Sequence, residues 1–133
     1  LILSGSNNYE GATNVTSGIV SVQHNNGLGS VAAGTFVTSG AELQLNKAAG
    51  LTIGGEALSL NGAGLGGTSG ALNNVSGNNT FGGVVTLATD STIKGSADTL
   101  TLSGGITSSN QALTIAGAGN VTVTGNITNG TGP

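Results

Sequence analysis

The feature that most constrains this sequence is a five-residue unit, apolar-x-apolar-x-Gly, that recurs along the whole chain. In each copy two large aliphatic residues are separated by one residue, and a glycine follows two positions later. Alternation with a period of two is typical of a β-strand with one buried face, and glycine is typical of the turn that ends it. The six copies begin at Leu1, Leu51, Leu58, Leu100, Leu113 and Val121.

The glycine content decides between a disordered chain and a repetitive fold. Glycine makes up 26 of the 133 residues, and each glycine inside a strand costs about 0.5–1 kcal/mol relative to alanine, so most must lie in turns. Disordered chains combine low hydrophobicity with high net charge, whereas here the mean hydropathy is +0.22 and the net charge is −3. Many turns and only three aromatic residues favour a solenoid, whose narrow core holds stacked rows of Leu, Ile, Val and Ala.

A longer repeat is superimposed on the short one. Residues 4–11, SGSNNYEG, align without gaps with residues 76–83, SGNNTFGG, 72 positions later. Tyr9 and Phe81 should therefore occupy equivalent positions in different coils, with both packed partly into a turn or neither. The residues predicted to form turns and side-chain ladders are Gly5, Asn7, Tyr9, Gly11, Gly77, Asn79, Phe81 and Gly83.

The alignment continues for a short distance on either side of this segment and then fails. Leu3 falls on Val75 and Val15 falls on Leu87, but the next aliphatic residues, Val20 and Val22, fall on Thr92 and Lys94. We expect a one-residue slip here, because it would turn Ile93 inward and Lys94 outward.

The pattern L-x-L-S-G-x-N-x-Y-x-G-x-T-x-V-x-x-G-x-V-x-V over residues 1–22 resembles the autotransporter-associated β-strand repeat of bacterial surface proteins. Residues 70–117 resemble the stretches that accompany this repeat in large repetitive passenger proteins, and the two regions together cover about half of the chain. Residues 23–69 resemble these repeats only in their general sequence character and do not match the motif itself. The resemblance implies a right-handed parallel β-helix that is exported across the bacterial envelope, to the cell surface or beyond, and serves as a rigid stalk or an adhesive surface.

The strand pattern agrees with that fold class, because it predicts an all-β chain with no helical periodicity. About three short strands per coil give a parallel β-helix of about five to six coils, roughly 25–30 Å long. We expect residues 1–133 to form a single β-helix repeat module, one unit of a longer tandem or stacked array. The residues predicted to form its core are Leu1, Leu3, Val15, Val20, Val22, Leu58, Leu60, Leu87, Leu100, Leu102, Leu113, Ile115, Val121 and Val123.

Composition argues against several classes of partner. With two lysines and no arginine, the chain offers no surface that could track the phosphates of nucleic acid. No apolar run approaches the roughly 20 residues that span a bilayer, so we expect no membrane insertion of this segment. The absence of cysteine excludes disulfides and thiolate metal sites and is compatible with export. The start at Leu1 indicates a processed chain or a segment of a longer one.

Catalytic and metal-binding patterns are weak. His24, the only histidine, has no acidic residue near it in the sequence, and the five acidic residues are dispersed. No Gly-Gly-x-Gly-x-Asp turn of the type that binds calcium in some solenoids is present. We therefore expect neither enzymatic activity nor a cofactor or metal.

Asparagine has two interpretations. Asn7 and Asn79 share one repeat position beside a glycine turn, where amide side chains can stack from coil to coil. The alternative is glycosylation at Asn-x-Ser/Thr triplets, which begin at Asn14, Asn74, Asn78, Asn120, Asn126 and Asn129. We favour the structural interpretation.

Two functions remain open. The first is a structural module of an extracellular fibre or surface stalk whose partners are further copies of itself. The second is an adhesin segment that binds a host or matrix glycan, or another surface protein, on a lateral face. A sugar-binding face should carry clustered aromatic residues or a charged patch, and the sequence offers neither. A polysaccharide lyase or hydrolase would need converging charged residues, which the composition does not supply.

The two ends of the sequence extend its internal repeat. Seven positions separate Ile106 from Leu113, and seven also separate Ile127 from Leu1 when Leu1 is written directly after Pro133. We therefore expect the β-helix to continue end to end, either as tandem copies in one polypeptide or as separate chains stacked head to tail. The alternative is that the sequence was merely divided at these points. The residues expected in the end-to-end contact are Leu1, Ile2, Leu3, Ile127, Thr128 and Pro133.

Overall fold

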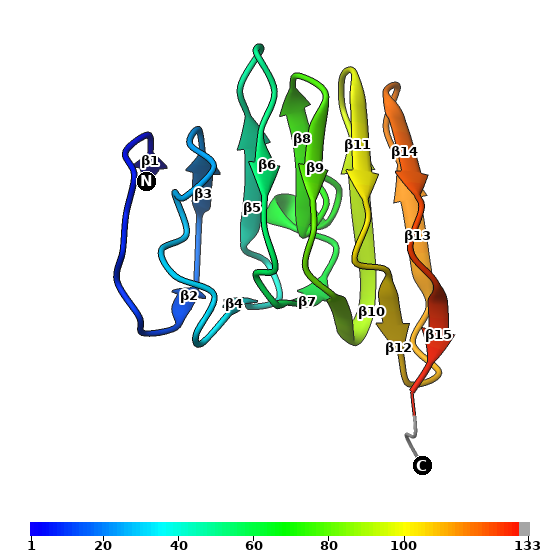
Figure 1. Cartoon of the computed structure of the whole chain (residues 1–133). Coiled ribbons are helices and arrows are strands. Elements are labelled where there is room, and N and C mark those ends of the chain that lie inside the picture. Colours follow the sequence, from blue (N-terminus) through cyan, green and yellow to red (C-terminus); the bar gives the residue numbers. More distant parts are fainter. Residues whose placement is uncertain (131–133) are drawn as a thin grey trace.

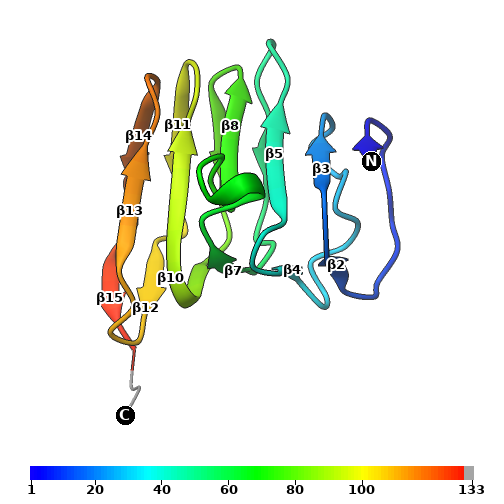
Figure 2. The ribbon, with the colours of Figure 1, turned by 180° about the vertical axis from the view of Figure 1, so that it is seen from behind.

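A computed structural model describes residues 1–130, and the regular secondary structure of these residues is almost entirely parallel β-strand (Figure 1). The strands wind into a right-handed parallel β-helix of about six coils, so the predicted fold class is confirmed. The first and last coils lie at opposite ends of the stack (Figures 1 and 2). The coils have three faces, which we call the first, second and third face, and from the third coil onward each coil contributes one strand to each of them.

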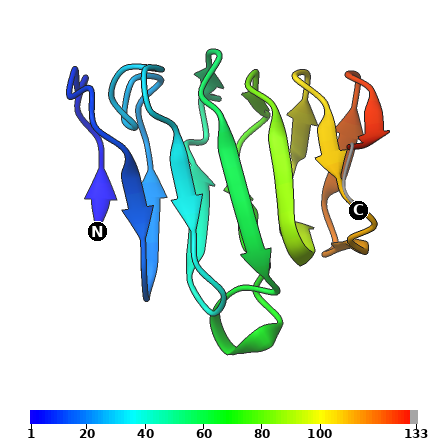
Figure 3. The same ribbon diagram turned by 90° about the horizontal axis from the view of Figure 1, so that it is seen from below.

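The first face, seen in front in Figure 2, contains one strand from each coil. Its strands are β1 (Ile2–Leu3), β3 (Ile19–Val22), β5 (Glu42–Asn46), β8 (Leu72–Ser76), the second half of β10 (Val85–Gly95) and β13 (Leu113–Ala116). The second face lies along the bottom of Figure 1 and faces the viewer in Figure 3. Its strands are β2 (Thr13–Val15), β4 (Thr35–Val37), β7 (Leu58–Gly62), the first half of β10, β12 (Ile106–Ser108) and β15 (Ile127–Asn129).

The third face is regular only from the third coil onward. It contains β6 (Thr52–Ile53), β9 (Asn79–Phe81), β11 (Thr99–Leu102) and β14 (Asn120–Val123). In the first two coils, residues 4–12 and 23–34 cover this side without forming a strand. The N-terminal coils are therefore less regular than the C-terminal ones.

Coil length also varies along the stack. In the last coils, Leu100 pairs with Val121 and Ile106 pairs with Ile127, so the sequence separation between paired strands is the same on two faces. The separation is larger where Leu43 pairs with Leu72, because residues 62–70 form an inserted loop with a 3-10 turn, η1 (Leu65–Gly67). The loop protrudes from the stack (Figure 3).

Aliphatic side chains stack in continuous columns inside the coils. Eight of the residues predicted for the core are buried: Val15, Val20, Val22, Leu58, Leu60, Leu87, Leu100 and Leu102. Four more, Leu3, Leu113, Val121 and Val123, are partly buried against this core. The prediction of burial is wrong for Leu1 and Ile115, which are 76% and 47% exposed, because each belongs to an end coil with no further coil stacked on it.

Strand pairing tests the repeat alignment. Val15, Val37, Leu60 and Leu87 form one column, so Val15 and Leu87 are equivalent as predicted. Val20 is connected through Leu43 and Leu72 to Ile93 rather than to Thr92, which confirms the expected one-residue slip.

The same pairing corrects the expected equivalence of Leu3 and Val75. The column that contains Leu3, Val22 and Leu45 continues to Asn74. The register then shifts between Leu45 and Asn46, where the pairing passes to Ser76, so that Val75 has no partner in β5.

Two predicted turn glycines are required by close backbone approach. Gly77 has a φ of 92°, and a side chain there would collide with the carbonyl oxygen of Lys47 in the preceding coil. Gly83 meets the backbone of Glu56 in the same way. Gly11, which aligns with Gly83, has open space around it, and a side chain at Gly5, which aligns with Gly77, would make only an ordinary contact with Asn7, so neither position requires glycine for lack of space.

Replacing Leu102 by Asp should prevent folding, because Leu102 is fully buried and an unpaired carboxylate there has no hydrogen-bond partner. Replacing the neighbouring Thr101, which is on the outer side of β11, by Asp should leave the fold intact. Soluble yield and thermal unfolding followed by circular dichroism provide the comparison. Equal yields of the two variants would contradict the alternation on which the coil assignment depends.

Candidate functional site

The surfaces that most distinguish this molecule are the two open ends of the coil stack. At the C-terminal end, β13, β14 and β15 each pair with a strand on one side only. Their inward side chains belong to the interior columns but are incompletely covered: Ile115 is 47% and Ile127 is 59% exposed. Unpaired backbone beside apolar side chains is a template on which a further strand can pair.

The N-terminal end presents a similar but smaller surface. Leu1 and Ile2 are 76% and 63% exposed, and Leu3 is half-buried against the core. The Leu1 ammonium donates a hydrogen bond to the carbonyl oxygen of Ile19. β1 and β2 supply only short strands, so less backbone is available here than at the other end.

The residues predicted for the end-to-end contact divide between these two surfaces. Leu1, Ile2 and Leu3 lie at the N-terminal end, and Ile127 and Thr128 lie in β15 at the C-terminal end. The two groups are at opposite ends of the molecule (Figure 1), so they can meet only between copies. Pro133 lies outside the described residues.

Two of the predicted turn and ladder residues, Gly77 and Asn79, belong to a polar network at one corner. The amide nitrogen of Asn79 donates to Asn74 Oδ1 at 2.7 Å and to the Ser76 carbonyl oxygen at 2.8 Å. Asn79 Oδ1 accepts from the Leu51 backbone N–H at 2.6 Å. Asn74 in turn donates to the carbonyl oxygens of Gly77 and Ala97. These contacts link three consecutive coils, and they leave Asn74 fully buried, so its triplet cannot present an acceptor for glycosylation.

Asn7 and Tyr9, which align with Asn79 and Phe81 in the sequence, are less enclosed than those residues. Asn7 donates one hydrogen bond to the Gly27 carbonyl oxygen. Phe81 is fully buried, whereas Tyr9 is 38% exposed and its hydroxyl contacts Thr13 Oγ1. The exposure of Tyr9 is therefore intermediate between that of an enclosed residue such as Phe81 and that of a residue fully in solvent. Tyr9 is partly exposed because it lies in the first coil, where no further coil covers one side.

Replacing Asn79 by Ala should destabilise the fold by about 2–6 kcal/mol, because the buried Leu51 N–H and Asn74 Oδ1 each lose a hydrogen-bond partner at about 1–3 kcal/mol. The control is Asn78→Ala. Asn78 is exposed and its Oδ1 accepts one hydrogen bond from the Thr99 N–H, which water can replace. Urea unfolding of both variants measures the difference. A loss for Asn78→Ala as large as that for Asn79→Ala would contradict the structural role of the buried amide.

Glu56 is a buried acid that sequence reasoning did not single out. Its Oε1 accepts a hydrogen bond from Thr35 Oγ1 at 2.7 Å, whereas Oε2 has no partner, and both residues are buried. Burial raises the pKa of the Glu56 carboxyl, and the hydrogen bond from Thr35 offsets part of that rise.

The raised pKa of Glu56 makes stability depend on pH. The folded chain holds this proton more tightly than the unfolded chain, so the stabilisation is complete below the ordinary glutamate pKa of about 4.3 and is lost as pH rises through the raised value. The thermal unfolding midpoint of the wild type should therefore fall as the pH rises from about 4.3 through the raised pKa of Glu56, and Glu56→Gln should remove that fall. Glu10→Gln, on the exposed surface, is the matched control and should retain the wild-type profile. A Glu56→Gln profile identical to wild type would refute the assignment.

A second buried acid lies on the outer side of the first face. Glu42 Oε1 accepts hydrogen bonds from the amide groups of Gln44 and Asn73, each at 3.0 Å. Asn73 Oδ1 in turn accepts a hydrogen bond from Ser96 Oγ at 2.7 Å. This cluster ties three coils together and is consistent with a structural role.

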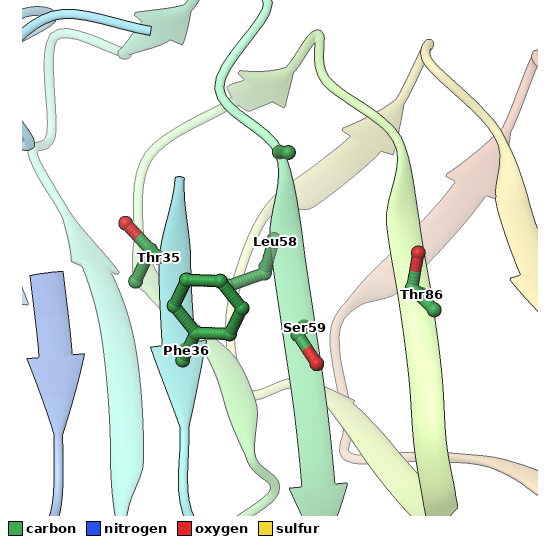
Figure 4. Close-up of a pocket in the computed structure, with 6 residues that line it drawn as sticks. Thr35, Phe36, Leu58, Ser59 and Thr86 are labelled. Carbon is green, nitrogen blue, oxygen red and sulfur yellow. The ribbon is translucent and has the colours of Figure 1, made fainter. Parts of the chain in front are cut away.

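The outer side of the second face carries a shallow recess of about 250 Å³ (Figure 4). Phe36, which is 46% exposed, forms one wall, and Ser59 and Thr86 follow it in the next two coils. Figure 4 shows Ser59 on the strand beside the Phe36 ring and Thr86 on the next strand along. The lining contains no charged group, so the recess can offer apolar contact and hydroxyl hydrogen bonds but no acid–base chemistry.

The remaining candidate groups are dispersed. His24 lies in a turn, where its Nδ1 accepts a hydrogen bond from the Asn26 N–H. Among residues 1–130 no three His, Cys, Asp or Glu side chains are grouped so that they could hold a metal ion. Within the same residues, no helix has the length and apolar character needed to cross a bilayer.

Comparisons with known proteins found no match among family models, curated proteins or solved structures.

Proposed function

We propose that this chain is a structural module of a bacterial extracellular fibre or surface stalk, and that its β-helix continues end to end into further copies. The observation that carries the proposal is the chemistry of the two ends. Ile115 and Ile127 at one end, and Leu1 and Leu3 at the other, extend the aliphatic columns of the interior. Covering them with another coil would give them the environment that Ile93 and Ile106 already have.

The lateral surface supports a role as a stalk. On the third face a column of outward threonines runs through four coils: Thr52, Thr80, Thr101 and Thr122. Such a neutral hydroxyl surface is well solvated and offers little for tight lateral association. Export to the cell surface or beyond is proposed on the resemblance of residues 1–22 and 70–117 to repeats of exported surface proteins.

The recess beside Phe36 favours a second candidate function, an adhesin segment that binds a neutral sugar. Exposed aromatic rings next to hydroxyl groups suit the apolar and polar sides of a sugar ring. The recess contains one aromatic residue rather than a cluster, so we place this function second.

Electron microscopy of the purified protein tests the first function. Wild type should form continuous fibres with an axial repeat of about six strand spacings, roughly 30 Å. Ile127→Asp should abolish the fibres, because the end-to-end contact would bury an unpaired charge. Since Ile127 is 59% exposed in the single molecule, this variant should still fold.

The control for Ile127→Asp is Thr122→Asp, in the same coil. Thr122 is exposed and points outward from β14, so a charge there remains in solvent after stacking, and fibres should form normally. A wild-type protein that stays monomeric at high concentration and binds an oligosaccharide in a Phe36-dependent manner would refute the fibre and favour the adhesin.

A further inference from the structure

We propose that copies of this chain stack in one particular register, in which Leu1, Leu3 and Val15 of one copy lie opposite Leu113, Ile115 and Ile127 of the copy before it. This inference rests on the proposed end-to-end function and deepens it, because it identifies the partner surface residue by residue. It follows from a gradual shift of the aliphatic columns through the stack.

On the first face the aliphatic pair moves by two residues from the first coil to the last. The column that starts at Leu3 continues through Val22 and Leu45, but then reaches Asn74 and Gly95. The neighbouring column contains Val20, Leu43, Leu72, Ile93 and Ile115 and stays aliphatic throughout. In the last coil the second aliphatic residue is Leu113, which lies opposite Ser91 on the other side of that column.

The second face shifts in the same direction and by the same amount. One of its columns contains Val15, Val37, Leu60 and Leu87 and then becomes polar at Ser108 and Asn129. The adjacent column begins with Thr13 and Thr35 and becomes aliphatic at Leu58, Val85, Ile106 and Ile127. The first and last coils therefore carry the same apolar pattern, displaced by two residues along the strands.

Two registers can join the ends with side chains on the correct faces, because a strand slip of two residues preserves the inward direction. If the columns simply continued, Leu1 would lie opposite Ile115, Thr13 opposite Ile127 and Val15 opposite Asn129. That arrangement places the aliphatic side chain of Val15 against the amide of Asn129, and the hydroxyl of Thr13 against Ile127.

The other register, shifted by two residues, matches like with like. Leu1 meets Leu113, Leu3 meets Ile115 and Val15 meets Ile127. Both strands of each copy satisfy it without a gap, because the sequence separation of Leu3 from Val15 equals that of Ile115 from Ile127. This shifted register also buries more apolar surface at the junction, and the geometry therefore points to it.

Cysteine pairs on the outer surface distinguish the two registers, since the chain contains no cysteine of its own. Ile2 is 63% exposed and points outward from β1, so its substitution does not disturb the core. In the shifted register Ile2 of one copy lies opposite Thr114 of the copy before it, whereas continued columns would place it opposite Ala116. Directly opposite residues lie about 4.8 Å apart, within the roughly 4.4–6.8 Å that a disulfide needs, and a two-residue displacement increases the separation to about 8 Å.

The 133-residue chain carrying Ile2→Cys and Thr114→Cys should form a ladder of disulfide-linked oligomers under mild oxidation, visible on a non-reducing gel. The chain with Ile2→Cys and Ala116→Cys should remain largely monomeric, and each single-cysteine variant should form dimers at most. A ladder from the Ala116 pair and none from the Thr114 pair would overturn the register, as would equal ladders from both pairs.

Sedimentation of the cysteine-free wild type separates failure of the register from failure of the proposed function. If wild type forms long assemblies and only the Ala116 pair gives a ladder, the register is overturned while the proposed end-to-end fibre stands. If wild type forms long assemblies but neither pair gives a ladder, end-to-end stacking in both registers is refuted, and the proposed fibre falls with this register. If wild type remains monomeric at high concentration, the proposed fibre and this register both fall.

Discussion

The structure depends on one constraint: a single coil cannot bury its own side chains and is held only by the coils on either side. Ile93 and Ile115 occupy one column and have the same chemistry, yet Ile93 is fully buried and Ile115 is half-exposed. The difference is the presence or absence of a neighbouring coil. Stability in such a stack is approximately the sum of contacts between nearest neighbours, so the end coils are its weakest parts and its natural contact surfaces.

Buried polar groups hold neighbouring coils in register where the aliphatic columns do not. The amides of Asn74 and Asn79 bond to three coils at one corner, next to the point where the β5–β8 register shifts. Glu42 lies among amide donors from two coils, directly beside the column of Leu43. Buried polar groups of this kind are costly unless they are bonded, so they favour one register over its neighbours.

Much of the fold was predictable because alternation and turn glycines are local properties of the sequence. They indicated the coils, most of the core and the slip that turns Ile93 inward. Register across coils of unequal length was harder to predict: the coil that contains the loop at residues 62–70 is longer than the others, and Asn74, not Val75, lies in the column of Leu3. The burial of Glu42 and Glu56 and the recess beside Phe36 depend on which residues meet from different coils, and no local pattern carries that information.

Native-state hydrogen exchange, measured residue by residue in dilute and in assembled protein, tests this account most directly. In dilute protein, amide protection should be greatest in β5, β8 and β11 and should decrease toward β1 at one end and toward β13, β14 and β15 at the other. On assembly the strands at the two ends should gain the most protection, because each then has neighbours on both sides. Uniform protection in the dilute protein, or end strands whose exchange does not change on assembly, would contradict the account.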